Sequence, residues 1–169
     1  MKLDYIAFTD DFFKNPPDED FDAEDASAYV GLEGYGKITP DLYLGGEIGY
    51  SGLDLGPWLS FWDHRDLEID ITFTELNLKY AKDLGHNFVV DVGAGLSYNK
   101  ATVTDETHRE ETDWLLGGQI FADLTYKIRW FSIGINGKYQ VTESFQDATS
   151  GYEFDLSNWR LGMQIGIVF

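Results

Sequence analysis

The 169-residue sequence contains no cysteine, which excludes disulfide bonds, thiolate catalysis and cysteine-ligated zinc. It also lacks any apolar run of about 18 residues, so a transmembrane helix is excluded. Basic residues are scarce, with 12 Lys and Arg against 30 Asp and Glu and a net charge of −18. Because nucleic-acid binding needs clustered positive charge, no nucleic-acid partner is expected, and cations or basic partners suit this charge better.

A secretion signal is missing as well, because Met1 is not followed by a basic segment and then an apolar one. Either the protein is cytosolic or the numbering describes a mature form from which a signal peptide has been removed. We expect the mature form, because the C-terminal stretch has the pattern of a membrane strand.

The stretch from Leu156 to Phe169 alternates apolar residues with Gly and polar residues. Such alternation is typical of a strand, in which successive side chains point to opposite faces. The apolar face consists of Trp159, Leu161, Met163, Ile165, Ile167 and Phe169. A soluble barrel or sandwich would place charges opposite its apolar face, whereas here the other face carries only Arg160. The pattern therefore favours an apolar face against lipid and a second face lining a narrow polar interior.

A chain that ends on Phe after such alternation resembles the final strand of a bacterial outer-membrane β-barrel. The resemblance implies that this strand is recognised by the barrel-assembly machinery. The rest of the chain divides in the same way, into predicted strands at 2–8, 26–38, 42–53, 68–80, 88–103, 114–128, 131–142 and 156–169. Short turns at 39–41, 83–87 and 129–130 alternate with long segments at 9–25, 54–67, 104–113 and 143–155, as short periplasmic turns alternate with long extracellular loops.

The sequence thus predicts one all-β domain over residues 1–169, an eight-stranded antiparallel up-and-down transmembrane β-barrel. It is similar to the small outer-membrane proteins of the OmpX and OmpA transmembrane-domain type. That resemblance implies a monomer in the bacterial outer membrane, in contact with its lipid and lipopolysaccharide.

The fourth predicted strand leaves two alternatives open. Ile69, Ile71 and Phe73 share one parity, whereas Leu76, Leu78 and Tyr80 share the other. A β-bulge near Thr74–Glu75 would reconcile the two halves. Otherwise one half of the strand points its apolar residues inward.

Aromatic residues predict two girdles, one at each end of the barrel. Those near the long segments are Tyr50, Tyr98, Trp114, Tyr139 and Trp159, and those near the short turns are Tyr80, Phe88, Tyr126, Phe131 and Phe169. From Phe88 to Tyr98, at ~3.3 Å per residue and a tilt of about 40°, the strand rises roughly 25 Å, which is the height of the apolar band of such a barrel.

The inward face predicts a polar network in the lumen. Its members are Glu33, Glu47, Glu75, Lys79, Asp91, Gln119, Asp123, Lys138, Arg160 and Gln164. The interior of an eight-stranded barrel is just wide enough for side chains, so buried charges there must pair or stay hydrated. We interpret the network as a plug; the alternative is an ion path or gate built from Arg160 and the acids.

The long segments carry 21 of the 30 carboxylates, counting the adjoining Glu68, but only three bases. In the first segment, acids stand at alternate positions, as the ligands of a calcium-binding loop do: Asp18, Asp20, Asp22 and Glu24. The segment lacks the Gly at the turn and the distant bidentate Glu of such a loop. We expect weak Ca²⁺ or Mg²⁺ association there and no cofactor.

The leading functional hypothesis is a structural or surface-interaction role through acidic, aromatic extracellular loops. The alternatives are a narrow channel for ions or small hydrophobic compounds, a lipid A-modifying enzyme, and a soluble ligand-binding barrel. Ser60, Asp63 and His64 lie close together in sequence, as an acyl-transfer site would need. However, Asp66 stands where a PagL-type lipid A deacylase has Ser, so no catalytic residue is predicted.

Overall fold

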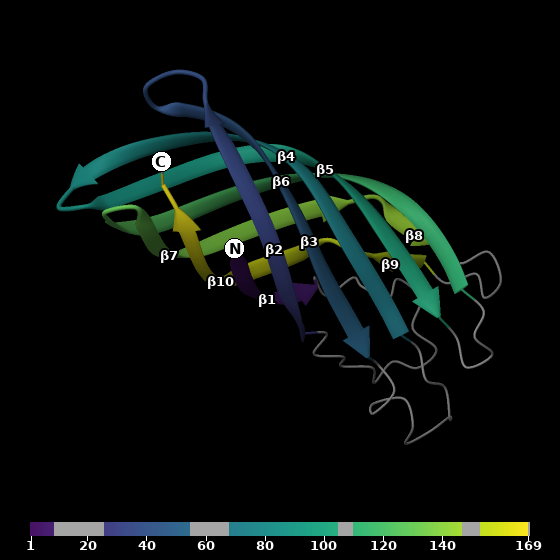
Figure 1. Cartoon of the computed structure of the whole chain (residues 1–169). Helices are drawn as coiled ribbons and strands as arrows, with labels where there is room; N and C mark the ends of the chain where they lie inside the picture. The colour runs from purple at the N-terminus through teal and green to yellow at the C-terminus, as the bar shows by residue number, and fades with distance from the viewer. Residues whose placement is uncertain (9–25, 55–67, 105–109, 147–152, 169) are drawn as a thin grey trace.

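The structure is a computed structural model, and it describes residues 1–8, 26–54, 68–104, 110–146 and 153–168. Eight long strands form the wall of a barrel (Figure 1): β1 (Lys2–Phe8), β2 (Ala26–Lys37), β3 (Leu42–Asp54), β4 (Glu68–Gly85), β5 (Phe88–Thr104), β6 (Glu110–Ile128), β7 (Phe131–Thr142) and β10 (Asn158–Ile167). A separate two-stranded hairpin pairs β8 (Ser144–Gln146) with β9 (Glu153–Asp155).

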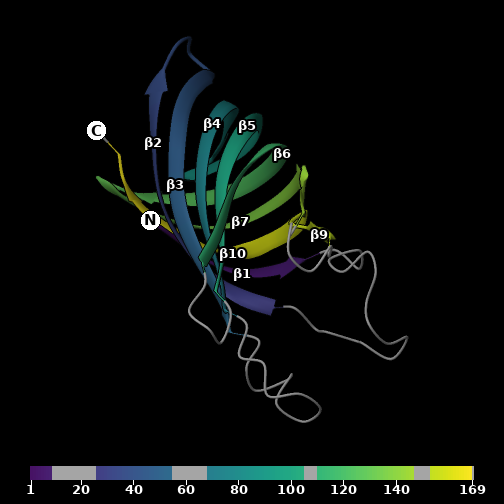
Figure 2. The same ribbon diagram turned by 90° about the vertical axis from the view of Figure 1, so that its right-hand side faces the viewer.

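The wall closes on itself in the order β1-β10-β7-β6-β5-β4-β3-β2, and every pairing is antiparallel. Figure 2 shows the strands wrapping around one interior. The all-β class, the strand number and the antiparallel order confirm the fold predicted from the sequence. Within the described part of the chain, no helix is long and apolar enough to cross a membrane.

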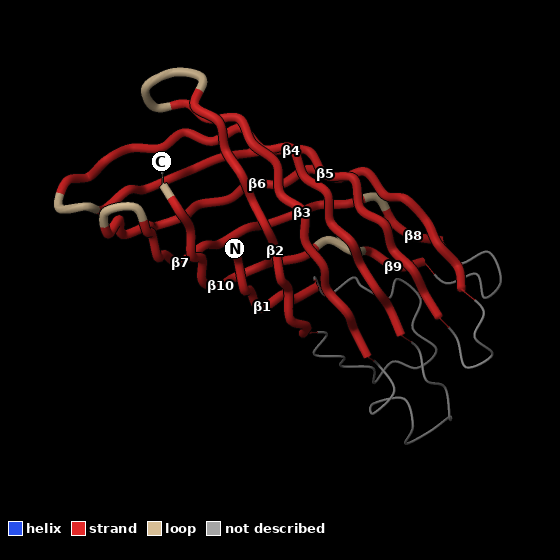
Figure 3. The backbone as a smooth tube through the Cα atoms, viewed as in Figure 1, coloured by secondary structure: helices blue, strands red, loops and turns tan. Residues whose placement is uncertain are grey.

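All three short connections lie at one end of the barrel, here called the turn end (Figure 3). Gly85, His86, Asn87 and Arg129 have positive φ angles, which tight two-residue hairpin turns require. The opposite end, where β3 and β5 end, is here called the loop end (Figure 1). Chain ends meet at the seam, where the Met1 ammonium donates a hydrogen bond to the Ile165 carbonyl at 2.7 Å.

Two of the predicted strands were too short. Strand β6 begins at Glu110 rather than Trp114, so the acidic stretch 110–113 pairs with β5 as part of the wall. Strand β4 continues past Tyr80 to Gly85. Beyond the apolar band both faces of a strand can carry polar side chains, so charge there does not end the strand. The β8–β9 hairpin, within the predicted segment 143–155, was not predicted.

Strand β4 settles the question of register. Its pairing with β3 is continuous from Tyr80 to Glu68, and the only shift against β5 lies between Asp83 and Gly85. The alternative of a bulge near Thr74–Glu75 is therefore excluded, and the alternative with inward apolar residues holds. Ile71 and Phe73 point inward and are fully buried, whereas Leu76 and Leu78 are exposed on the outer surface.

The outer surface of the described strands is apolar over a broad band. Leu96, Leu161 and Ile120 are 70%, 68% and 61% exposed, and many further Leu, Ile and Val side chains are exposed around them. In the described strands, the outward positions between the two sets of aromatic residues carry no charged side chain. Monomeric soluble proteins rarely expose an apolar patch of this extent, so the band is suited to lipid.

Candidate functional site

Three glutamates lie side by side on the inner wall. Glu33 of β2 is the direct cross-strand partner of Glu47 of β3, which is in turn the partner of Glu75 of β4. Like charges at directly opposite positions destabilise a sheet. Three adjacent carboxylates inside a barrel therefore require cations from elsewhere.

The required cations come from β1, which pairs with β2 in the wall, and from β7 and β10, which pair with none of the three glutamate strands. Lys2 of β1 lies 3.1 Å from Glu33 and 3.3 Å from Glu47, measured from Nζ to Oε2. Lys138 of β7 lies 2.7 Å from Glu47 and also pairs with Glu75.

Arg160 of β10 completes the set, with its Nη2 atom 2.6 Å from Glu75 Oε1. The order Glu33, Lys2, Glu47, Lys138, Glu75, Arg160 alternates in charge, and we call it the charge ladder. Its six formal charges cancel, so the ladder as a whole is neutral.

Aromatic rings pack against the charge ladder. Tyr29 donates a hydrogen bond from its hydroxyl to Glu47 Oε1 at 2.5 Å and meets Phe73 edge-on, with ring centroids 5.5 Å apart. The guanidinium carbon of Arg160 lies 4.6 Å and 4.7 Å from these two ring centroids. Two Arg160 nitrogens, Nε and Nη1, have no hydrogen-bond partner among the described residues. Cation–π attraction to the two rings stabilises that part of the guanidinium.

Glycine makes room for one of these rings. A Cβ atom at Gly49 would lie 2.1 Å from the Tyr29 hydroxyl oxygen and 2.3 Å from two of its ring carbons. The side chain of Tyr29 thus crosses the lumen over bare backbone. Part of the Gly content of these strands follows from filling a narrow lumen with large side chains.

The charge ladder lies across the lumen as a packed plug. Each of its side chains is buried, and only Glu33, at 16% side-chain exposure, retains appreciable contact with solvent. Breaking a buried ion pair leaves an uncompensated charge and is strongly unfavourable. Chemically, the arrangement therefore resists separation of its paired side chains.

The other predicted lumen residues lie inside the barrel but outside the charge ladder. Lys79 pairs with Asp91 at 3.3 Å. Gln119 donates to Asn77 at 2.8 Å, and Gln164 donates to Thr125 at 3.0 Å. Asp123 is 2% exposed and makes no hydrogen bond within the described residues.

Sequence reasoning missed several members of the interior. Lys2 alternates with the apolar Leu3, Tyr5 and Ala7, so the parity of its strand could have assigned it to the lumen. Tyr29 precedes the outward Val30 in the same strand, so the same parity assigns Tyr29 to the inward face. That it contacts Glu47 depends on the closed barrel, and no local pattern shows it.

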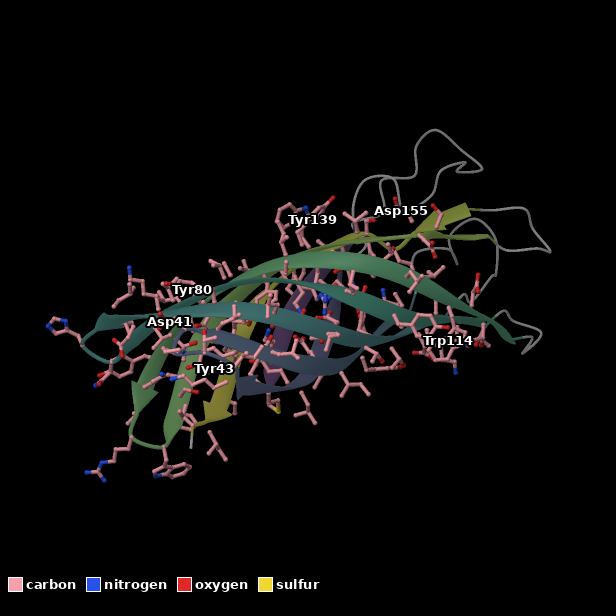
Figure 4. The ribbon with its side chains drawn as sticks, turned by 90° about the horizontal axis from the view of Figure 1, so that it is seen from above. Asp41, Tyr43, Tyr80, Trp114, Tyr139 and Asp155 are labelled. Carbon is pink, nitrogen blue, oxygen red and sulfur yellow. The ribbon has the colours of Figure 1, made fainter. Side chains whose placement is uncertain are left out.

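The aromatic residues predicted as girdles occupy the outer surface where they are described. Near the loop end Tyr98 stacks on Trp114 and Tyr139 packs on Trp159, with ring centroids 4.7 Å and 4.4 Å apart. Near the turn end Phe88 packs on Tyr126, at 4.9 Å. Tyr50, Tyr80 and Phe131 are also on this surface. Figure 4 shows Tyr80 toward one end of the barrel and Trp114 toward the other.

Some candidate residues lie outside the described part of the chain. These are Phe169, the four acids Asp18, Asp20, Asp22 and Glu24, and the Ser60, Asp63 and His64 group. Among the residues that are described, no three His, Cys, Asp or Glu side chains are grouped so that they could hold a metal ion.

Comparison with solved structures identifies the fold. Neisserial surface protein A aligns over 99% of this chain and 95% of its own, with a TM-score of 0.66 and 12% identity. This chain has the fold of the small outer-membrane β-barrels. The N-terminal barrel of Pseudomonas aeruginosa OprF aligns over 99% of this chain and 96% of its own, with a TM-score of 0.56 and 14% identity.

A third structure, Ail of Yersinia pestis, aligns over 99% of this chain and 94% of its own, with a TM-score of 0.55 and 11% identity. No protein-family model matches the chain, and no curated protein sequence matches it. At such low identities the shared property is the fold, and function must be argued from the residues of this chain.

Proposed function

We propose that this chain is a monomeric surface-interaction protein of the bacterial outer membrane, held in lipid by its barrel and acting through its acidic extracellular loops. The observation that carries the proposal is the charge ladder, which fills the lumen with paired side chains while the outer surface presents an apolar band. A barrel that is closed inside and apolar outside serves as an anchor.

The composition of the long segments supports the interaction role. Counting the adjoining Glu68, they contain 21 carboxylates and three bases, Lys14, Arg65 and Arg109. Like charges at this density repel one another unless counter-ions gather among them. Divalent cations bridging these carboxylates to lipopolysaccharide phosphates would relieve the repulsion and attach the loops to the membrane surface.

Charge also distinguishes the ligand expected for this chain from the ligand bound to one structural neighbour. The Ail structure contains the heparin analogue sucrose octasulfate, a sulfated ligand. Loops with so many carboxylates would repel such a ligand. A direct partner of this chain is therefore expected to be a cation or a basic macromolecule.

The final strand carries one further part of the proposal, which is recognition by the assembly machinery. Its outward Leu161, Met163 and Ile165 alternate up to the chain's last residues, as the assembly machinery of outer-membrane barrels would require. No catalytic activity and no cofactor are included in the proposal.

Two measurements on purified, reconstituted protein test the proposal. In a planar bilayer we expect no stable openings of porin size, with a larger porin as the positive control; such openings would favour the channel hypothesis instead. In vesicles we expect lipopolysaccharide to bind in Ca²⁺ and not in chelator, and the triple substitution Asp18→Asn, Asp20→Asn, Asp22→Asn to weaken binding. Equal binding in calcium and in chelator would contradict the cation-bridged role.

A further inference from the structure

A second row of polar side chains crosses the inner wall, and its charges are not balanced. Asp91 of β5 is the direct cross-strand partner of Asp123 of β6, which is the partner of Asn136 of β7. The same register continues through Gly162 of β10 to Asp4 of β1. We call Asp91, Asp123, Asn136 and Asp4 the aspartate row.

Oxygen atoms in this row are buried and without partners. Asp91, Asp123 and Asn136 are 5%, 2% and 2% exposed. Asp91 Oδ1, both carboxylate oxygens of Asp123, Asn136 Oδ1 and Asp4 Oδ1 accept no hydrogen bond from the described residues. Buried polar atoms are nearly always partnered, by protein, water or an ion. Four of these oxygens belong to Asp91, Asp123 and Asn136 on three adjacent strands, and they point to a ligand that they share.

The charges of the row call for a cation. Lys79 pairs with Asp91 at 3.3 Å, but Lys2, the other ammonium that acts on Asp123, is already paired with Glu33 and Glu47. Three carboxylates thus share one cation of their own, and two negative charges stay unpaired. In the charge ladder, by contrast, three carboxylates meet three cations.

The geometry of the row is compatible with a hard divalent ion. Side chains of directly opposite residues stand about 5 Å apart, so oxygens from two of them can approach one ion at the 2.3–2.6 Å that Ca²⁺ prefers. Asn136 donates its Nδ2 hydrogen to Asp4 Oδ2 at 2.9 Å, so its own Oδ1 atom is available as a ligand. Gly162 allows this contact, since a Cβ atom there would lie 2.3 Å from Asp4 Oδ1.

We propose that the aspartate row binds one Ca²⁺ or Mg²⁺ ion in the lumen, on the carboxylates of Asp91 and Asp123 and the amide oxygen of Asn136. Because no three acidic or His side chains among the described residues form a closed cage, the ion keeps part of its water shell. This site is separate from the acidic extracellular segments, and it ties β5, β6 and β7 together from inside.

The test separates the lumen site from the loops. Folded protein in detergent is stripped with chelator and dialysed against Ca²⁺ alone or Mg²⁺ alone, and bound metal per barrel is measured together with the thermal unfolding midpoint. The background carries Asn at positions 18, 20 and 22. Asp123→Asn should lose one tightly bound ion and the metal-dependent rise in midpoint, whereas Asp113→Asn, exposed on the same strand, should keep both.

Asp91→Asn provides a second variant with the same expected losses, in case Asp123→Asn does not fold. Equal metal content in the Asp123 and Asp113 variants overturns the proposal. A second result would also overturn the proposal. If the protein with Asp123 shows the infrared band of a neutral carboxyl group at neutral pH, and Asp123→Asn lacks that band, the row is neutralised by a proton rather than by a metal.

Discussion

Replacing Glu75 by Gln tests the charge ladder directly. Glu75 accepts from Arg160 at 2.6 Å and pairs with Lys138, while Arg160 has only Gln140 as its other acceptor, at 2.8 Å. The amide keeps the size of the side chain and removes its charge. Among the described residues, Arg160 would then have no carboxylate partner, and Lys138 would keep only Glu47.

Two effects of this substitution oppose each other. Removing Glu75 relieves its repulsion by Glu47, whose side chain stands about 5 Å away as a cross-strand neighbour. Coulomb energy varies inversely with distance, so one attraction at 2.6 Å is about twice as strong as one repulsion at about 5 Å. Glu75 has two such attractions, and the loss of attraction therefore dominates. We expect a cost of about 3–5 kcal/mol, as for other buried ion pairs that lose one partner.

Glu33→Gln is the matched control, because it makes the same chemical change in the same row. Glu33 contacts one cation, Lys2, which keeps Glu47 at 3.3 Å, so the expected cost is about 1 kcal/mol. Urea unfolding of the protein in lipid vesicles measures both, with an unchanged denaturant slope as evidence that the barrel still unfolds completely. If the two variants differ by less than about 0.5 kcal/mol, the charge ladder does not stabilise the barrel in the way described here.

Three further predictions concern other parts of the molecule. Ile120 points outward on β6, midway between Trp114 and Tyr126, and Ile120→Arg should destabilise the folded protein in vesicles by about 2–4 kcal/mol. Thr112→Arg, beyond Trp114 on the same strand, should cost about 1 kcal/mol or less. Equal costs for the two variants would refute the lipid-facing assignment. Gly49→Ala should cost about 1–3 kcal/mol in the same assay through its collision with Tyr29, and Gly34→Ala, whose Cβ would have no neighbour within 4 Å, should be tolerated. Millimolar Ca²⁺ or Mg²⁺ should slow hydrogen exchange in residues 10–25 and 105–109; unchanged exchange there would favour a basic macromolecular partner over cations.

The fold could be predicted from the sequence because alternation is a local signal. Each strand shows its own period of two, and closure of the barrel follows from eight such strands joined by alternating short and long connections. Phe121 illustrates the strength of parity, since it is an apolar residue at an inward position and the structure buries it to 5% exposure. The same rule, applied strictly to Ile71 and Phe73, would have avoided the bulge alternative.

Partners inside the lumen could not be predicted, because they depend on which strands face each other across the barrel. Glu75 and Arg160 are 85 residues apart, and Asn136 and Asp4 are 132 apart. Parity assigns these side chains to the interior but gives no angle around the barrel axis. Strand ends were also poorly predicted, as at Glu110, because beyond the lipid a strand needs no apolar face.

The charge ladder has a consequence for the order in which the barrel can assemble. Its three glutamates belong to the consecutive strands β2, β3 and β4, while its three cations come from β1, β7 and β10. A partly built sheet of β2 to β4 therefore exposes three like charges on one face. Lys2, on the neighbouring strand β1, can compensate part of this charge, whereas the cations that pair with Glu75 among the described residues come from β7 and β10. The strand that closes the barrel against β1 thus also carries Arg160, so the final joining step completes the ion pairs of Glu75.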